Sequence, residues 1–215
     1  MKNKDLPNGW ASVALSDIAE VSAGSPAPQG KDKFSPDGTP FVRVQDMGRL
    51  SNQKVLHQTS DHVNEFGSTG LKLFPKGTVL LTKSGASTLL NQRAVLGQES
   101  HVVSHIATVS ASPVTSPDWL YYFLKTVDAA SLSHGGNMPS LPLSRVTQIS
   151  TPIAPLNEQR RIVEKIDTLF ARLDQGEAGL REVQELLARY RQSVLKAAVN
   201  GELTADWRAE NAHRL

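Results

Sequence analysis

The apolar positions of residues 156–199 follow a helical repeat that no proline interrupts. Ten positions are separated by alternating steps of four and three residues: Ile162, Ile166, Leu169, Leu173, Gly176, Leu180, Val183, Leu187, Tyr190 and Val194. These steps are typical of the a and d positions of a heptad repeat. The pattern predicts a long α-helix with one apolar seam, made of these ten residues, that pairs with another helix in a coiled coil.

The seam is longer than a small domain can cover. The 33 residues from Ile162 to Val194 span roughly 50 Å at about 1.5 Å per residue. Leaving nine apolar side chains exposed, at about 1.5–3 kcal/mol each, would cost roughly 13–27 kcal/mol, an upper bound above the stability of a typical domain. The helix therefore needs a partner helix, either in a coiled coil or, as the alternative, in the core of a globular bundle.

Residues 1–150 have short apolar runs separated by segments rich in Gly, Pro, Ser and Thr. Residues 78–81 and 106–109 are typical of short strands, and residues 75–77 are typical of a turn. A helix is expected at about 117–130, because Ser116 offers a cap and Pro117 suits the first turn. The pattern predicts a mixed α+β domain followed by the long helix.

Composition narrows the class of protein only slightly. The net charge of +2, from 23 Lys and Arg against 21 Asp and Glu, neither favours nor excludes nucleic-acid binding. The absence of cysteine from the sequence excludes disulfides, thiolate nucleophiles and Cys-based zinc sites. The sequence has no apolar run of about 18 residues and no signal-peptide pattern at its N-terminus, so we expect a cytoplasmic protein that does not enter a membrane.

No sequence motif predicts catalysis or metal binding. Residues 24–31, GSPAPQGK, have one residue too many between the glycines of a phosphate-binding loop, and Asp32 stands where Ser or Thr is needed. His101 and His105 lack the glutamate of a zinc-binding HExxH helix and lie in a run typical of a strand. We therefore expect a protein that is not an enzyme and binds no cofactor or metal itself.

Several segments together resemble the specificity subunit of type I restriction-modification systems. They are LPNGW at 6–10, the helix-like VALSDIAE at 13–20, TPFVRVQDM at 39–47, FPKGTVLLTKSGAS at 74–87, GGNMPSLPLSRVTQISTPIAPLNEQRRIVEKID at 135–167 and GELTADWRAEN at 201–211. PLNEQRRIVEKID is the most specific of them. Subunits of that family usually contain two target-recognition domains and two antiparallel helical spacers, so the resemblance implies half a subunit. It implies a target-recognition domain at 1–153, a spacer helix at 154–200 and a tail at 201–215.

The resemblance also implies a division of labour. This chain would recognise one half-site in double-stranded DNA and act as a scaffold, a methylation subunit would use S-adenosylmethionine, and a restriction subunit, a translocase and nuclease, would use ATP and Mg. Two alternatives stay open: a recognition fragment of a DNA adenine methyltransferase, and a coiled-coil scaffold that binds no DNA.

DNA contacts are expected from loops of residues 1–150, because base edges are reached by side chains that enter a groove. The candidates are Lys31, Lys33, Arg43, Gln45, Arg49, Lys83, Ser84, Asn91, Gln92 and Arg93. The methylation subunit is expected at the flanks of the spacer, at Arg160, Arg161 and Trp207. The alternative for Trp207 is that its ring folds back onto its own helix.

A half-subunit lacks the second spacer helix, so we expect an antiparallel homodimer through the seam. Gly176 and Gly179 lie near the middle of the helix, where missing side chains would let two copies cross closely. The alternative is that these glycines kink the helix, which each weakens by about 1 kcal/mol. A twofold dimer predicts a DNA target of two inverted half-sites separated by unread base pairs.

Overall fold

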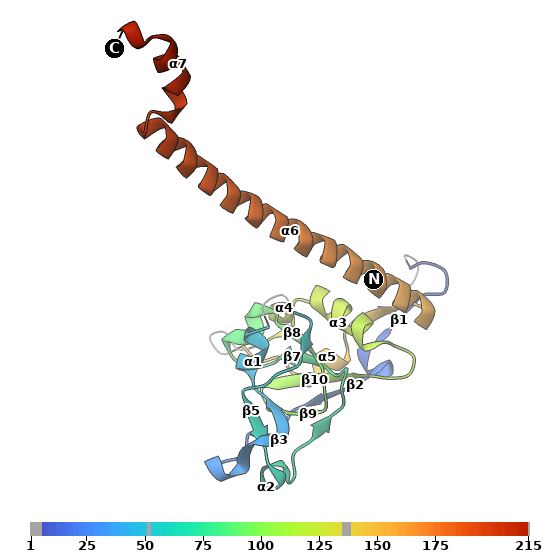
Figure 1. Ribbon diagram of the computed structural model, residues 1–215. Helices are drawn as coiled ribbons and strands as arrows, with labels where there is room; N and C mark the ends of the chain where they lie inside the picture. Colours follow the sequence, from blue (N-terminus) through green and yellow to red (C-terminus); the bar gives the residue numbers. More distant parts are fainter. Residues whose placement is uncertain (1–5, 51–52, 135–138, 215) are drawn as a thin grey trace. The chain divides into compact units, whose positions relative to one another are not determined.

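The structure, a computed structural model, describes residues 6–50, 53–134 and 139–214. The chain divides into two compact units, Met1–Val163 and Glu164–Leu215 (Figure 1). Among the residues described, every β-strand lies in the first unit, and the second contains most of the long helix and the C-terminal tail. Residues 135–138, at the start of one family-like segment, lie outside the described part of the chain.

Mixed β-sheets form the centre of the first unit. The larger sheet has the strand order β2 (Ala19–Ala23), β10 (Ile106–Ala111), β7 (Val79–Thr82), β8 (Arg93–Leu96) and β4 (Val55–Leu56). The second sheet has the order β5 (Asp61–Val63), β3 (Phe34–Val42), β9 (Ser100–Val102) and β6 (Leu73–Phe74). Each sheet combines one parallel pair, β4 with β8 and β3 with β9, with antiparallel pairs. The expected strands at 78–81 and 106–109 are β7 and β10, which pair with each other.

Strand β7 has apolar side chains on both faces because both faces are covered. Val79 and Leu81 pack in a core with Leu120 and Leu124 of helix α3 (Pro117–Thr126). Leu80 points the other way and packs in a second core with residues of β3 and β9. Successive side chains of a strand alternate between faces, so a continuous apolar run indicates a strand buried on both sides.

Helix α3 begins where the sequence predicts but ends earlier. The Ser116 hydroxyl accepts a hydrogen bond from the backbone N–H of Trp119, 3.1 Å away, and Pro117 occupies the first turn. The chain is extended at Val127, and Asp128 then caps a second short helix, α4 (Ala129–Leu132). The expected single helix at about 117–130 is therefore two helices.

The helix-like segment at 13–20 is not a helix. It contains the end of β1 (Ala11–Ala14), a single 3-10 turn at Leu15–Asp17 and the start of β2. Val13 pairs with Thr151 in an antiparallel ladder between β1 and β11 (Ser150–Ile153). Pairing with a strand more than 130 residues away in sequence overrides the local helical pattern.

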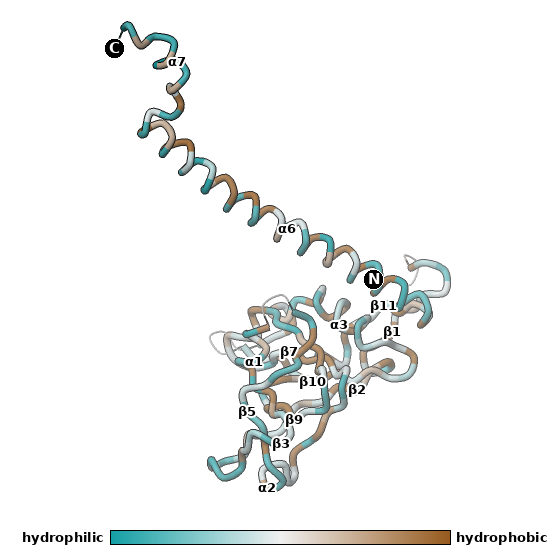
Figure 2. The backbone as a smooth tube through the Cα atoms, viewed as in Figure 1, coloured by the Kyte–Doolittle hydropathy of each residue, from teal (hydrophilic) through white to brown (hydrophobic). Residues whose placement is uncertain are grey.

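The predicted long helix is confirmed as α6 (Leu156–Val199), which continues without a break through Gly176 and Gly179. A 3-10 turn at Glu202–Thr204 and helix α7 (Ala205–Glu210) follow. Apolar stretches recur along α6 (Figure 2). In the described part of the chain, every helix is too short or too polar to cross a membrane.

Candidate nucleic-acid interface

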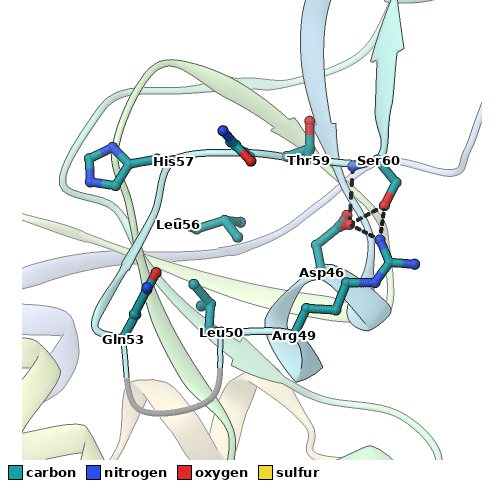
Figure 3. A pocket seen from close by; sticks show the side chains of 9 residues that line it. Asp46, Arg49, Leu50, Gln53, Leu56, His57, Thr59 and Ser60 are labelled. Atoms are coloured by element: carbon teal, nitrogen blue, oxygen red, sulfur yellow. Dashed lines mark hydrogen bonds and ion pairs between the residues drawn. The ribbon is translucent and has the colours of Figure 1, made fainter.

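Helix α1 (Val44–Gly48) and the chain that follows it surround an open pocket of about 490 Å³ (Figure 3). Most of its lining is polar: Asp46, Arg49, Leu50, Gln53, Leu56, His57, Gln58, Thr59 and Ser60. The expected contacts at Gln45 and Arg49 therefore lie on or beside one hollow surface. Gln45 is exposed in the first turn of α1, and Arg49 lies on the rim.

The buried carboxylate of Asp46 holds this pocket together. It accepts hydrogen bonds from the backbone N–H of Arg43 at 2.8 Å and from the backbone N–H and hydroxyl of Ser60 at 3.1 and 2.7 Å. The first bond closes the N-terminal turn of α1, where a negative charge is favourable. The other two fasten Ser60, at the end of the irregular segment 57–60 that follows β4 (Val55–Leu56), to that helix. The two walls are thus fixed to each other through one side chain.

Arg49 is exposed and anchored at the same time. Its Nη1 donates to the Ser60 hydroxyl and lies 3.7 Å from the Asp46 carboxylate, while 67% of the side chain is open to solvent. A guanidinium has five N–H groups in a fixed plane, so several remain available to a ligand. An oriented guanidinium on a pocket rim is suited to paired hydrogen bonds with a guanine edge or a phosphate.

Three further polar residues of this pocket, Gln53, His57 and Gln58, are exposed and were not predicted from the sequence. Their only local signal is a cluster of amide and imidazole side chains on either side of the apolar pair Val55-Leu56. Glutamine amides can form paired hydrogen bonds with adenine.

The predicted segments 43–49 and 91–93 also meet. A Cβ atom added to Gly48 would lie 3.5 Å from Nε2 of Gln92. Gln92 is half-buried, and its amide lies beside α1 at Gly48.

Arg43 has an internal role. Its guanidinium is paired with Asp61 and lies over the rings of Phe34 and Phe41, with distances to the ring centres of 5.8 and 5.5 Å. The residue that follows β3 is thereby joined to the first residue of β5 by a half-buried ion pair. The structure accounts for Arg43 without a DNA contact.

Arg93 and Asn91 have internal roles as well. Arg93 is buried and donates to the backbone carbonyls of Gln92, Leu124 and Val127 and to the side-chain oxygen of Asn91. Burial lowers the pKa of Arg93 to about 10, although the charge of Asp128 raises it, so the side chain is still protonated near neutral pH. The Asn91 oxygen also accepts from the N–H of Ala129 at 3.2 Å. Arg93 and Asn91 together bond to backbone groups at the end of α3 and the start of α4. The guanidinium of Arg93 is therefore buried and does not extend to the surface where it could reach a base.

The remaining four candidates, three lysines and one serine, lie in two other places. Lys31 and Lys33 belong to a 3-10 turn, η3 (Lys31–Lys33), which contacts α2 (Glu65–Ser68). Lys33 pairs with Asp32 at 3.4 Å and lies over the exposed ring of Phe66. Lys83 and Ser84 are half-buried where the chain after β7 meets residues 140 and 141. The ten candidates therefore do not form one patch.

Two of the family-like sequences, LPNGW at 6–10 and the start of PLNEQRRIVEKID, meet at the start of α6, in a joint formed by Trp10, Trp119, Glu158 and Gln159. Trp10 Nε1 donates to the Glu158 carboxylate at 3.2 Å, and its ring packs edge-on against Trp119. Gln159 is fully buried, and all its amide atoms are bonded within the first unit. Arg160 and Arg161, expected to bind a partner, are exposed on the same turns.

The seam of α6 is largely uncovered in the single chain. Leu169, Leu173, Leu180, Val183, Leu187 and Tyr190 are between 46% and 68% exposed. Gly176 and Gly179 have no atom within 4 Å of the position of an added Cβ, so open space surrounds them. Trp207 of α7 is 53% exposed.

Comparisons with known proteins point to one family. The model of the type I restriction modification DNA specificity domain matches residues 7–184. The chain is 28% identical to the type I restriction enzyme StySPI specificity subunit of Salmonella potsdam over 225 residues, which cover 100% of this chain and 47% of that protein. It is 28% identical to the EcoKI specificity subunit of Escherichia coli (strain K12) over 217 residues, which cover 94% of this chain and 45% of the relative.

Solved structures share the fold. One, described as showing complex assembly and conformational transition of the type I R-M system, has a TM-score of 0.72 at 20% identity and covers 90% of this chain and 46% of its own. The HsdS subunit from Thermoanaerobacter tengcongensis has a TM-score of 0.62 at 21% identity and covers 81% of this chain and 40% of its own. The chain thus spans about half the length of the relatives it matches.

Proposed function

The chain belongs to the family of type I restriction modification DNA specificity domains, and we propose that it recognises one half-site of the DNA target of a type I restriction-modification complex. The observation that carries this proposal is the match over residues 7–184, together with the polar pocket beside α1. We propose a non-catalytic role, as in the relatives named specificity subunits. Because it would bind chromosomal DNA, we propose that the protein acts in the cytoplasm.

The proposed reading surface is centred on the pocket of Figure 3. Arg49, Gln53 and Gln58 would make the hydrogen bonds to base edges, because guanidinium and amide groups can form paired bonds with guanine and adenine. His57 lines the same pocket, Gln45 is exposed on α1, and Gln92 lies beside α1 at Gly48. Lys31, Lys33, Lys83 and Ser84 lie elsewhere on the domain and would contact the DNA backbone, which positions the protein without specifying sequence. Arg43, Asn91 and Arg93 would support the surface from inside.

The test is Arg49→Ala and Gln58→Ala in a complex reconstituted with a methylation subunit. Each should cost about 1–3 kcal/mol in binding of the specific site and relax the sequence preference at one position. Lys76→Ala and Gln148→Ala are matched controls, since both residues are exposed and neither lines the pocket. Unchanged affinity and an unchanged methylation pattern in both pocket variants would refute this surface.

We propose that two copies pair through the α6 seam as an antiparallel homodimer. Six large apolar seam residues are about half-exposed or more in the single chain, which is unfavourable in water unless a second helix covers them. The open space around Gly176 and Gly179 gives two helices room to approach. Two identical domains related by a twofold axis would bind two inverted copies of one half-site.

The dimer is tested by measuring molecular mass in solution for Leu173→Glu combined with Leu180→Glu. Charges buried at the crossing should separate the copies while the melting of the first unit stays unchanged. Gln175→Glu with Gln192→Glu adds the same charge away from the seam and should leave the dimer intact. A wild-type monomer at micromolar concentration would contradict the proposal.

The partner subunits carry the chemistry in this proposal. The methylation subunit, with S-adenosylmethionine, would dock at Arg160 and Arg161, whose exposed guanidinium groups lie next to the buried joint at Gln159. A restriction subunit would bring ATP and Mg. Arg160→Glu with Arg161→Glu should abolish co-purification with the methylation subunit without changing the dimer mass.

One assay separates this function from the alternatives. Methylation of DNA from S-adenosylmethionine only when a methylation subunit is added supports the specificity subunit. Methylation by the purified chain alone would indicate a methyltransferase fragment, and no methylation under either condition would leave the scaffold.

A further inference from the structure

An apolar groove lies in the first unit beside the start of α6. It has a volume of about 500 Å³ and is lined by Gly9, Ala11, Ile18, Pro113, Val114 and residues 153–156. None of these residues has a charged or hydrogen-bonding side chain. Val114 is 56% exposed at its edge. The groove is therefore suited to an apolar ligand or side chain.

The C-terminal tail carries apolar side chains that are exposed in the single chain. Val199 ends α6, Leu203 lies in the following turn, and Trp207 lies on α7; each is more than half exposed. The tail is held in shape, since Arg208 donates to the Thr204 hydroxyl at 2.6 Å and the Asn211 side chain donates to the Trp207 carbonyl at 2.9 Å. An ordered tail that exposes an indole has the features of an interface anchor.

Gly176 and Gly179 lie at the middle of α6, and this position determines which parts of two antiparallel copies would meet. Val199, the last residue of α6, lies 23 residues after Gly176, and Leu156, the first residue, lies 23 residues before Gly179. Two antiparallel helices that cross at these glycines therefore bring the end of one level with the start of the other. The start of α6 is part of the groove, because Leu156 lines it. Within one chain, a helix of 44 residues separates Leu156 from Val199 by about 65 Å.

We propose that Trp207 of each copy docks into the apolar groove of the second copy, against Val114 and Leu156. This inference rests on the proposed antiparallel dimer and adds a second contact at each end of it. Among the described residues, those that line the groove are all uncharged and apolar, so the indole would meet apolar side chains, and a tryptophan side chain can bury about 150–250 Å². In this proposal Trp207 binds a second copy of this chain and does not bind the methylation subunit.

The experiment is a double-mutant cycle on the dimer dissociation constant of the full chain, measured by dilution with sedimentation. Trp207→Ala and Val114→Asp should each weaken the dimer by about 30-fold, and the double variant should be no weaker than the weaker single variant. Leu90→Asp places a charge on an exposed apolar residue outside the groove and should have no effect. Melting of each variant checks that the first unit remains folded.

The outcomes separate the two proposals. Additive losses, or a dimer unaffected by Trp207→Ala, would overturn the tail contact and leave the seam dimer standing. If Trp207→Ala abolished binding of the methylation subunit and left the dimer affinity unchanged, the tail would bind that subunit. This result would also overturn the proposed contact between the tail and the groove. A wild-type monomer would refute the seam dimer itself, which the Leu173 and Leu180 variants test independently.

Discussion

Replacement of Gln159 by methionine should strongly destabilise the first unit. Methionine has nearly the length and volume of glutamine, so the change removes hydrogen bonds and leaves the packing almost intact. Gln159 Oε1 accepts from the Ser116 N–H at 3.0 Å and the Thr115 hydroxyl at 3.3 Å. Its Nε2 donates to the carbonyls of Val114 at 3.1 Å and Ala154 at 2.8 Å. One side chain therefore joins α6 to the segments before it and to the cap of α3.

The loss of unfolding free energy is estimated from the hydrogen-bonding groups that each lost bond leaves without a partner. The bonds to Thr115 and Ala154 are buried, so their partners would be left unsatisfied at about 1–3 kcal/mol each. The bonds to Ser116 and Val114 are partly buried and contribute about 0.5–1.5 kcal/mol each. Methionine recovers part of this total through apolar burial. The expected loss is about 2–6 kcal/mol, which would lower a urea midpoint by about 1–3 M.

The assay is urea unfolding followed by tryptophan fluorescence in a Trp207→Phe background. The two remaining tryptophans, Trp10 and Trp119, pack against each other at this joint and report its opening. Asn157→Ala, an exposed change within the same turn, is the control and should cost less than about 0.5 kcal/mol. A loss below about 1 kcal/mol for Gln159→Met would mean that apolar packing around Trp119 and Val163 holds the joint, and the reasoning would be wrong.

Three further changes test other parts of the structure. Arg93→Met should lower the unfolding free energy by about 2–4 kcal/mol, because it leaves buried carbonyls unpaired, so Arg93 would act on DNA binding only through the amount of folded protein. Weaker DNA binding at unchanged stability would instead indicate that Arg93 contacts DNA. Gly67→Ala should cost about 1–3 kcal/mol in thermal unfolding, since its Cβ would lie 2.2 Å from the Lys33 carbonyl oxygen; a neutral result would show that η3 moves freely. Gly176→Ala should strengthen the isolated helix by about 1 kcal/mol and yet weaken the dimer, and a tighter dimer in sedimentation would argue against crossing at this glycine.

The sequence determined the features that depend on neighbouring residues. The steps of four and three residues fixed the long helix and its seam, because helical periodicity is a property of the local chain. Ser116 and Pro117 fixed the start of α3, because a cap acts within one turn. The apolar runs at 78–81 and 106–109 located two strands of the larger sheet. The family-like segments identified the family before any contact was known.

The tertiary structure decided which residues are free to act. Arg43, Arg49 and Arg93 look alike in the sequence, but their partners lie far along the chain: Asp61 for the first, Ser60 for the second, and the carbonyls at the end of α3 for the third. Only Arg49 retains an exposed guanidinium on the pocket. Likewise, the strand at β1 and the burial of Gln159 depend on segments brought together by folding. Local patterns specify an element, whereas the availability of a polar side chain depends on long-range contacts that satisfy or expose its hydrogen-bonding groups.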